Sequence, residues 1–224
     1  MVDYVDLIKK PFSDWKKLSI GALFYLIPFI NIITGFFGSG YSLTCANKPK
    51  KELPEWKDFG KLFVLGLKSF AIGFLYFLPV LIISTVLVYQ IISPLIPSIL
   101  SETITTEELT TALLALGGKL FLIIALILIV SYITPMAIIN FVKKDKFKEA
   151  FNFSSILKKI FTGKYLLTCI VIILYSIVLS MIAGFLAALT SITIVLPYIF
   201  SAYISIIGGI TTFSIFGEAY DEIK

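Results

Sequence analysis

The chain has 224 residues, of which 58% are hydrophobic and 15% are charged, and its formal net charge is +5. A soluble domain has about 45–50% apolar and about 25% charged residues, and the apolar excess here lies in long uncharged runs. The composition excludes a soluble globular domain, a disordered chain and a secreted disulfide scaffold, and it predicts an all-α, polytopic helical membrane protein.

The first apolar run, residues 18–46, has lysine clusters on both sides, at residues 9–17 and 48–51. Lysine-rich segments stay on the cytoplasmic side of a membrane, so a hairpin of two short helices, broken near Pro28, keeps both clusters inside. A single kinked and tilted span is the alternative, and it would place the first cluster outside. The segment before the run is expected to lie at the membrane interface, with Trp15 in contact with lipid.

Residues 53–70 carry aromatic and leucine side chains at steps of three or four, with charged residues on the opposite side. This pattern is typical of an amphipathic helix, and Pro54 suits its first turn. A helix with an aromatic face and a lysine-rich back is expected to lie in the plane of the lipid headgroups. The predicted interfacial lipid contacts in this helix are Trp56, Lys57, Phe59, Lys61 and Phe63.

Four uncharged apolar runs follow, at residues 70–92, 120–142, 166–189 and 192–216. Each exceeds the roughly 20 residues that a bilayer span needs, so we predict four clear transmembrane helices. The last two are expected to form a hairpin that turns near residues 190–191.

The segment between the first two spans, residues 93–118, carries glutamates but no lysine, so it is predicted to be external. Thr105 and Glu108 have the spacing of a capping box, in which each residue bonds the backbone N–H of the other. We therefore expect a short helix over residues 106–116, ended by the glycine pair at 117–118.

A second lysine-rich amphipathic segment covers residues 146–165, and its predicted lipid contacts are Phe147 and Phe151. Every lysine except Lys119 lies in a segment that this topology places on the cytoplasmic face. We therefore expect a multi-pass protein of the cell membrane with a cytoplasmic C-terminus and a cytoplasmic N-terminus.

The residues of catalysis are scarce in this chain. It has no His and, since all its basic residues are Lys, no Arg, and the four clear spans contain no ionisable side chain. Ionisable residues at membrane depth mark proton relays and ion pathways, so their absence argues against proton-coupled transport and intramembrane hydrolysis. We predict no catalytic, cofactor-binding or metal-ligating residue, no cofactor and no nucleic-acid partner.

Prolines interrupt the apolar runs at Pro28, Pro79, Pro135 and Pro197. A proline inside a helix frees the carbonyl four residues before it, and broken helices with free carbonyls bind substrate in some transporters. Such kinks are also common in membrane helices whose neighbours satisfy the freed groups.

We interpret residues 1–224 as a single integral membrane domain. Its parts are an N-terminal interfacial segment with the apolar hairpin (1–47), an interfacial helix with a span, the external loop and a second span (48–142), and an interfacial helix with the C-terminal hairpin (143–224).

Three stretches, at residues 11–18, 52–63 and 217–220, resemble an uncharacterised membrane-protein family of archaea and bacteria, domain-of-unknown-function family 4013. The most specific part is Leu-Pro-Glu-Trp-Lys-Asp-Phe-Gly at 53–60. The resemblance implies the membrane class over nearly the whole chain, and it implies no activity and no site residues.

These features favour a non-enzymatic integral membrane protein that interacts with membrane lipids or organises other membrane proteins. The alternative is a small-solute transporter or channel that uses the proline-kinked spans, with a polar path through Asn31, Ser131, Tyr132 and Thr193. A membrane-protein partner and a homo-oligomer both stay open.

A reporter fused at residue 2 tests the predicted hairpin. Because the hairpin returns the chain to the cytoplasmic side, we expect a green fluorescent protein fused there to fluoresce and an alkaline phosphatase fused there to be inactive. Fusions in residues 93–118 should give the opposite pattern. An active phosphatase at residue 2 would establish an external N-terminus and exclude the hairpin topology.

Overall fold

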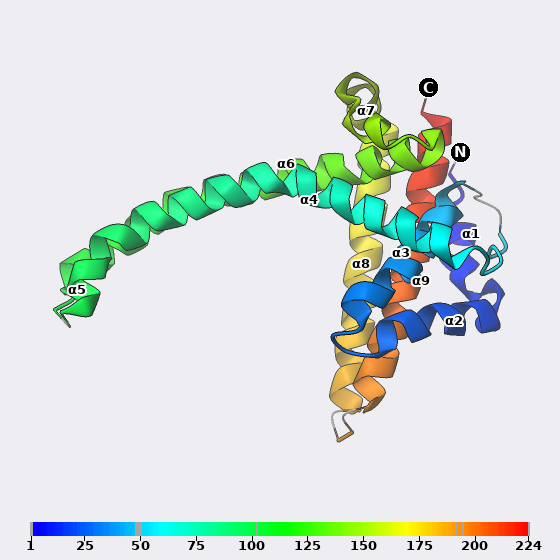
Figure 1. Cartoon of the computed structure of the whole chain (residues 1–224), viewed down its shortest axis with the longest axis horizontal. Helices are drawn as coiled ribbons and strands as arrows, with labels where there is room; N and C mark the ends of the chain where they lie inside the picture. Colours follow the sequence, from blue (N-terminus) through cyan, green and yellow to red (C-terminus); the bar gives the residue numbers. More distant parts are fainter. Residues whose placement is uncertain (1, 48–50, 102, 191, 194, 224) are drawn as a thin grey trace. The chain divides into compact units, whose positions relative to one another are not determined.

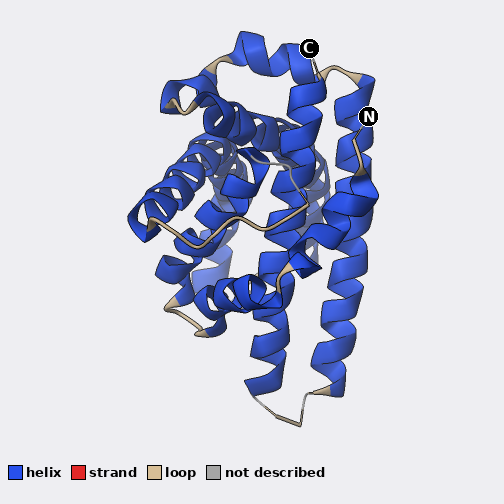
Figure 2. Ribbon diagram, turned by 90° about the vertical axis from the view of Figure 1, so that its right-hand side faces the viewer, coloured by secondary structure: helices blue, strands red, loops and turns tan. Residues whose placement is uncertain are grey.

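The computed structural model describes residues 2–47, 51–101, 103–190, 192–193 and 195–223, and every regular element within them is helical (Figures 1 and 2). Residues 48–50 and 191, which contribute to the topology prediction, lie outside this described part. The chain forms two compact units. The first comprises Met1–Ile72 and Pro135–Lys224, and the second comprises Gly73–Thr134.

The chain begins with α1 (Tyr4–Lys9), the 3₁₀ helix η1 (Lys10–Ser13), α2 (Trp15–Leu26) and α3 (Asn31–Asn47). The long helix α4 (Phe59–Ile92) continues into the second unit, where η2 (Ser93–Leu95) and α5 (Ile96–Leu100) lead to α6 (Thr106–Lys144). The first unit closes with η3 (Phe147–Phe151), α7 (Phe153–Ile160), α8 (Gly163–Leu189) and α9 (Val195–Glu222).

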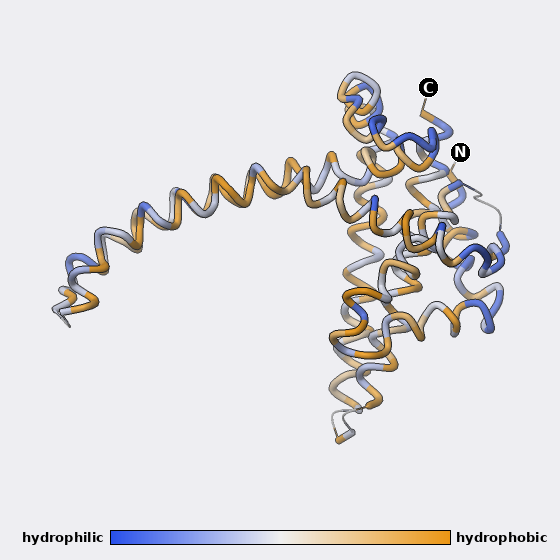
Figure 3. Tube along the Cα trace, viewed as in Figure 1, coloured by the Kyte–Doolittle hydropathy of each residue, from blue (hydrophilic) through white to orange (hydrophobic). Residues whose placement is uncertain are grey.

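The four predicted spans are confirmed as helices long and apolar enough to cross a membrane, at Phe59–Leu100, Thr106–Lys144, Gly163–Leu189 and Val195–Glu222. Figure 3 shows their long hydrophobic stretches, with hydrophilic residues concentrated toward their ends. Within the apolar windows of the first three, at most 11% of residues are buried. These helices therefore present apolar side chains outward along most of their length, as a lipid environment requires.

The N-terminal apolar run is a helical hairpin, so this alternative is confirmed over the single kinked span. Helix α2 ends at Leu26 and α3 begins at Asn31, with Phe29 between them at φ 67°. The two helices pack along each other, and the Thr34 hydroxyl donates to the Phe24 carbonyl at 2.6 Å.

Polar contacts bring the predicted cytoplasmic segments to one end of the first unit. The contacts are the Asp3 amide to Glu218 at 3.4 Å, Asp6 to Lys51 at 2.5 Å, Lys143 to Asp221 at 2.6 Å and Lys164 to Glu222 at 3.2 Å. The described residues near the two termini, Lys51 and the lysines at both ends of the second lysine-rich segment therefore share one end, as the charge pattern requires. The side of the membrane on which this end lies stays a prediction.

The predicted amphipathic helix over residues 53–70 is wrong in its first part. Residues 53–58 are not helical, and α4 begins at Phe59 and runs on into the span. A residue before proline is disfavoured in the helical conformation, and here the Leu53 and Pro54 carbonyls accept hydrogen bonds from Lys17 and Tyr41 at 3.0 and 2.8 Å. Tertiary hydrogen bonds thus replace the helical ones.

The external segment is only partly as predicted. The capping box is confirmed, since the Thr105 amide donates to Glu108 at 3.0 Å and the Glu108 amide donates to the Thr105 hydroxyl at 3.2 Å. The predicted stop at residues 117–118 is wrong, because α6 continues through both glycines to Lys144. A helical glycine costs only about 1 kcal/mol, and neither glycine adopts a positive φ.

The second amphipathic segment is divided rather than continuous. Asn152 caps α7 by accepting from the Ser155 amide at 3.2 Å, and Thr162 caps α8 by accepting from the Tyr165 amide at 3.3 Å. The buried side of α7 consists of Ile156 and Ile160, whereas Phe161, directly after α7, is exposed.

Two of the four prolines lie in the interior of a helix, Pro79 in α4 and Pro135 in α6. Pro28 lies in the turn between α2 and α3, and Pro197 lies in the first turn of α9. Pro28 is therefore the break of the predicted hairpin. The prediction that Pro197 kinks a helix is wrong, because the N–H groups of a first turn have no helical partner in any case.

Helix α3 approaches its neighbours closely at glycines. A Cβ atom at Gly40 would meet the Leu62 carbonyl of α4, and one at Gly66 would meet the Phe36 carbonyl of α3. Toward α9, Gly217 faces the Ala46 carbonyl in the same way. Small residues that let helix backbones approach each other are typical of membrane-helix packing.

We predict that Gly66→Leu destabilises the first unit and that Gly73→Leu does not. Overpacking costs about 1–3 kcal/mol, and a side chain at Gly66 would press on backbone, whereas a Cβ at Gly73 meets no atom within 4 Å. In a Cys169→Ala background, the thiol of the buried Cys45 reports unfolding through a maleimide dye during heating. Equal midpoints for the two variants would contradict the close-packing argument.

Candidate functional site

The most distinctive grouping of side chains in the first unit is a set of eight aromatic rings, here called the aromatic cluster. Its members come from α2, α3, the segment 53–58 and the start of α4, and they are Phe24, Phe36, Phe37, Tyr41, Trp56, Phe59, Phe63 and Phe70.

Trp56 links the rings of α2 and α3. Its indole stacks on Tyr41 at a centroid distance of 3.8 Å with an interplanar angle of 3°, and it lies 5.3 Å from the Phe24 ring. Its Nε1–H donates to the Lys17 carbonyl at 2.9 Å. Aromatic pairs contribute about 0.5–1.5 kcal/mol each beyond their buried area, so this cluster orders the non-helical segment 53–58.

Lys17 holds the same segment from its other side. Its ammonium lies 2.6 Å from Glu55 and 3.6 Å from Asp14, besides its bond to the Leu53 carbonyl. The hydrogen bond with Lys17 lowers the pKa of Glu55. The positive charge of Lys17 is therefore already paired with acidic groups of the protein.

The exposed rim of this region combines aromatic rings with lysines. Trp15 is 62% exposed and packs against Phe12 at 5.8 Å, and Phe59 is 46% exposed. The exposed lysines of the same segments are Lys16, Lys57 and Lys61. Exposed amphipathic rings and ammonium groups in the same segments suit the boundary between apolar chains and charged headgroups.

The predicted lipid contacts thus fall into three groups. Trp15, Lys57, Phe59 and Lys61 are exposed, whereas Trp56 and Phe63 are partly buried in the aromatic cluster. Phe147 and Phe151 form a separate group in η3, where Phe147 packs on Phe141 at 6.1 Å and on Phe151 at 5.7 Å.

Two buried polar residues were not identified as sites from the sequence. Lys10 is 1% exposed and donates to the Cys45 carbonyl at 3.3 Å, and burial lowers its pKa. Asn140, a polar residue in an apolar run, donates to the Glu149 carbonyl at 2.6 Å and accepts from the Tyr220 hydroxyl at 2.7 Å. Both residues link helices at the polar end of the unit.

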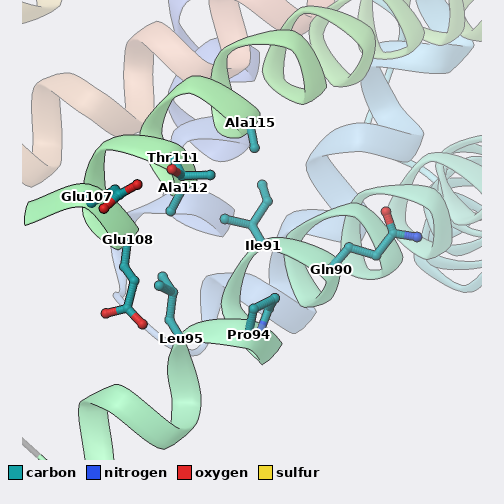
Figure 4. A pocket seen from close by; sticks show the side chains of 9 residues that line it. All are labelled: Gln90, Ile91, Pro94, Leu95, Glu107, Glu108, Thr111, Ala112 and Ala115. Carbon is teal, nitrogen blue, oxygen red and sulfur yellow. The ribbon is translucent and has the colours of Figure 1, made fainter. Parts of the chain in front are cut away.

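The second unit has a pocket of about 400 Å³ between the end of α4 and the start of α6 (Figure 4). Its lining is mostly apolar, with the Gln90 amide at the end opposite to Glu107 and Glu108. Glu108 is engaged, since Ser98 donates to it at 2.8 Å and the capping box uses its other oxygen. The pocket therefore offers few polar groups for a ligand.

No group of three or more His, Cys, Asp or Glu side chains within the described ranges could hold a metal ion. The exposed groups of the first unit include lysine ammonium groups, aromatic rings and apolar side chains. This chemistry suits the binding of amphiphiles.

Comparison with known families gives one match, over residues 20–188, to the family described as "Protein of unknown function (DUF4013)". Neither the curated proteins nor the solved structures contain a match. The matched residues include the whole aromatic cluster.

The two tryptophans should behave differently on substitution. Trp56→Phe removes the N–H donor to Lys17, and loss of a hydrogen bond costs about 0.5–1.5 kcal/mol, so we expect a lower unfolding midpoint. Trp15→Phe should leave the midpoint unchanged because its ring is 62% exposed. Acrylamide should quench the remaining tryptophan more strongly in Trp56→Phe than in Trp15→Phe. The reverse order of quenching would contradict the assigned packing of Trp56.

Proposed function

The chain belongs to the DUF4013 family of proteins of unknown function, and we propose that it is a non-enzymatic integral membrane protein that binds and organises anionic lipid around its lysine-rich end. The observation that carries the proposal is the exposed Trp15 ring next to the exposed Lys16 in α2. The segment 53–58, which Lys17 and Trp56 tie to α2, and the start of α4 add the exposed lysines Lys57 and Lys61. A lysine close to an anionic membrane surface contributes about 1 kcal/mol, or about fivefold in binding.

The arrangement of the lysines supports this proposal. The ammonium groups of Lys10 and Lys17 donate hydrogen bonds to backbone carbonyls of the protein. The side chains of Lys16 and Lys57 make no such hydrogen bond within the described ranges, and they extend from segments that the aromatic cluster holds in place. Ordered backbone under exposed cations reduces the conformational entropy that lipid binding has to overcome.

The rival function, a small-solute transporter or channel, has less support. Pro28 and Pro197 lie outside helix interiors, so two of the four expected carbonyl sites are lost. Of the residues of the expected polar path, Asn31 begins α3 and Thr193 lies in the connection between α8 and α9. Both are helix-end positions.

Quenching by brominated lipids tests the proposal. In a Trp56→Phe protein, Trp15 is the sole tryptophan. After reconstitution in mixed bilayers, we expect brominated phosphatidylglycerol to quench Trp15 more than brominated phosphatidylcholine does. The preference should decline at high salt, because screening weakens exposed charge interactions.

Lysine variants on the two faces test whether the preference for the anionic lipid depends on the lysines near Trp15 or on the total charge of the protein. Replacing Lys16, Lys57 and Lys61 by Gln should bring the two lipids close to equal quenching. Lys119→Gln, at the only lysine expected on the other face, should preserve the preference. Equal quenching by both lipids in the parent protein would overturn the proposal.

A further inference from the structure

A groove of about 530 Å³ lies within the first unit between α3, α4 and the end of α6. We call it the α3–α4–α6 groove. Its lining includes Gly60, Lys61, Val64, Leu65, Lys68 and Asp145.

The groove has charged and apolar parts. Lys61 and Lys68 lie on the same side of α4, because positions i and i+7 are about two helical turns apart. Between them, Val64 and Leu65 provide apolar surface, and Leu65 is only partly exposed. The lining is therefore that of a site for a molecule with an anionic group and a hydrocarbon part.

The available charge in the groove is positive. Lys61 pairs with Asp58 at 3.3 Å, but both side chains are highly exposed, so water competes with this pair. Lys68 has no ion-pair partner within the part of the chain that the structure describes. Asp145 is the single acid of the lining, which leaves the two lysines in excess.

We propose that the α3–α4–α6 groove binds the phosphate headgroup of one anionic phospholipid from the surrounding bilayer, with Lys61 and Lys68 as its cationic contacts. This inference rests on the proposed function and names the site within it. A membrane lipid is favoured over a soluble anion because the lysines flank apolar surface at the start of a helix long enough to span a membrane.

Gly60 provides a way to fill the groove without disturbing the fold. A Cβ atom at this lining position meets no other atom within 4 Å, and leucine is a better helix former than glycine. Gly60→Leu should therefore occupy space that the lipid needs.

Native mass spectrometry of the full chain, released from detergent after delipidation and titration with phosphatidylglycerol or phosphatidylcholine, tests the site. We expect one tightly bound phosphatidylglycerol and no equivalent phosphatidylcholine adduct. Lys68→Gln should weaken the adduct about fivefold, and Gly60→Leu should remove it. The matched controls Lys119→Gln and Gly73→Leu should retain it.

The other outcomes are decisive against the groove. Retention of the phosphatidylglycerol adduct in both Lys68→Gln and Gly60→Leu would overturn the site. Displacement of the adduct by millimolar inorganic phosphate would also overturn it, because it would indicate a soluble anion as the ligand. If the brominated-lipid preference of Trp15 persists in either case, the groove fails while the proposed function stands. Loss of that preference in the parent protein would remove both.

Discussion

The close approach of α3 to its neighbours is the constraint on which the first unit depends. Gly40 and Gly66 bring the backbones of α3 and α4 into contact, and Gly217 does so for α3 and α9. In a membrane, helix association relies on van der Waals packing rather than on the hydrophobic effect. The glycine contacts therefore set the spacing at which the aromatic rings of α3 and α4 meet and the groove between these helices forms.

The lysines at the polar end of the first unit fall into two groups, those whose ammonium groups bind other parts of the protein and those whose ammonium groups, in the part of the chain that the structure describes, do not. Lys10 and Lys159 are structural: Lys10 bonds the Cys45 carbonyl, and Lys159 bonds the carbonyls of Tyr220 and Ile223 and lies 4.1 Å above the Tyr220 ring. Burial lowers the pKa of both. Lysines such as Lys16 and Lys68 lack such engagement within the described ranges. The proposed lipid chemistry depends on this second group, which the sequence alone does not distinguish.

Predictions from local sequence motifs are confirmed here where no distant part of the chain competes for the same hydrogen-bonding groups. The capping box of Thr105 and Glu108 forms as predicted because both partners lie within one turn of exposed chain. The helix predicted from residue 53 fails because Lys17 and Tyr41, distant in sequence, bond the carbonyls that a helix would use. The glycine pair at 117–118 fails as a stop because a helix within apolar surroundings keeps its own hydrogen bonds.

The sequence by itself determined the membrane class, the four spans and the separation of lysine-rich from lysine-free segments, because hydrophobic length and charge act through the solvent rather than through particular contacts. It left two alternatives for the N-terminal run, and the packing of α2 on α3 decided for the hairpin. Only the tertiary structure decided which aromatic side chains are buried, which lysines are engaged and where a groove lies. Trp56 and Trp15 are both flanked by charged residues in sequence. One is stacked on Tyr41 and the other is exposed, because packing between distant segments is not encoded in local periodicity.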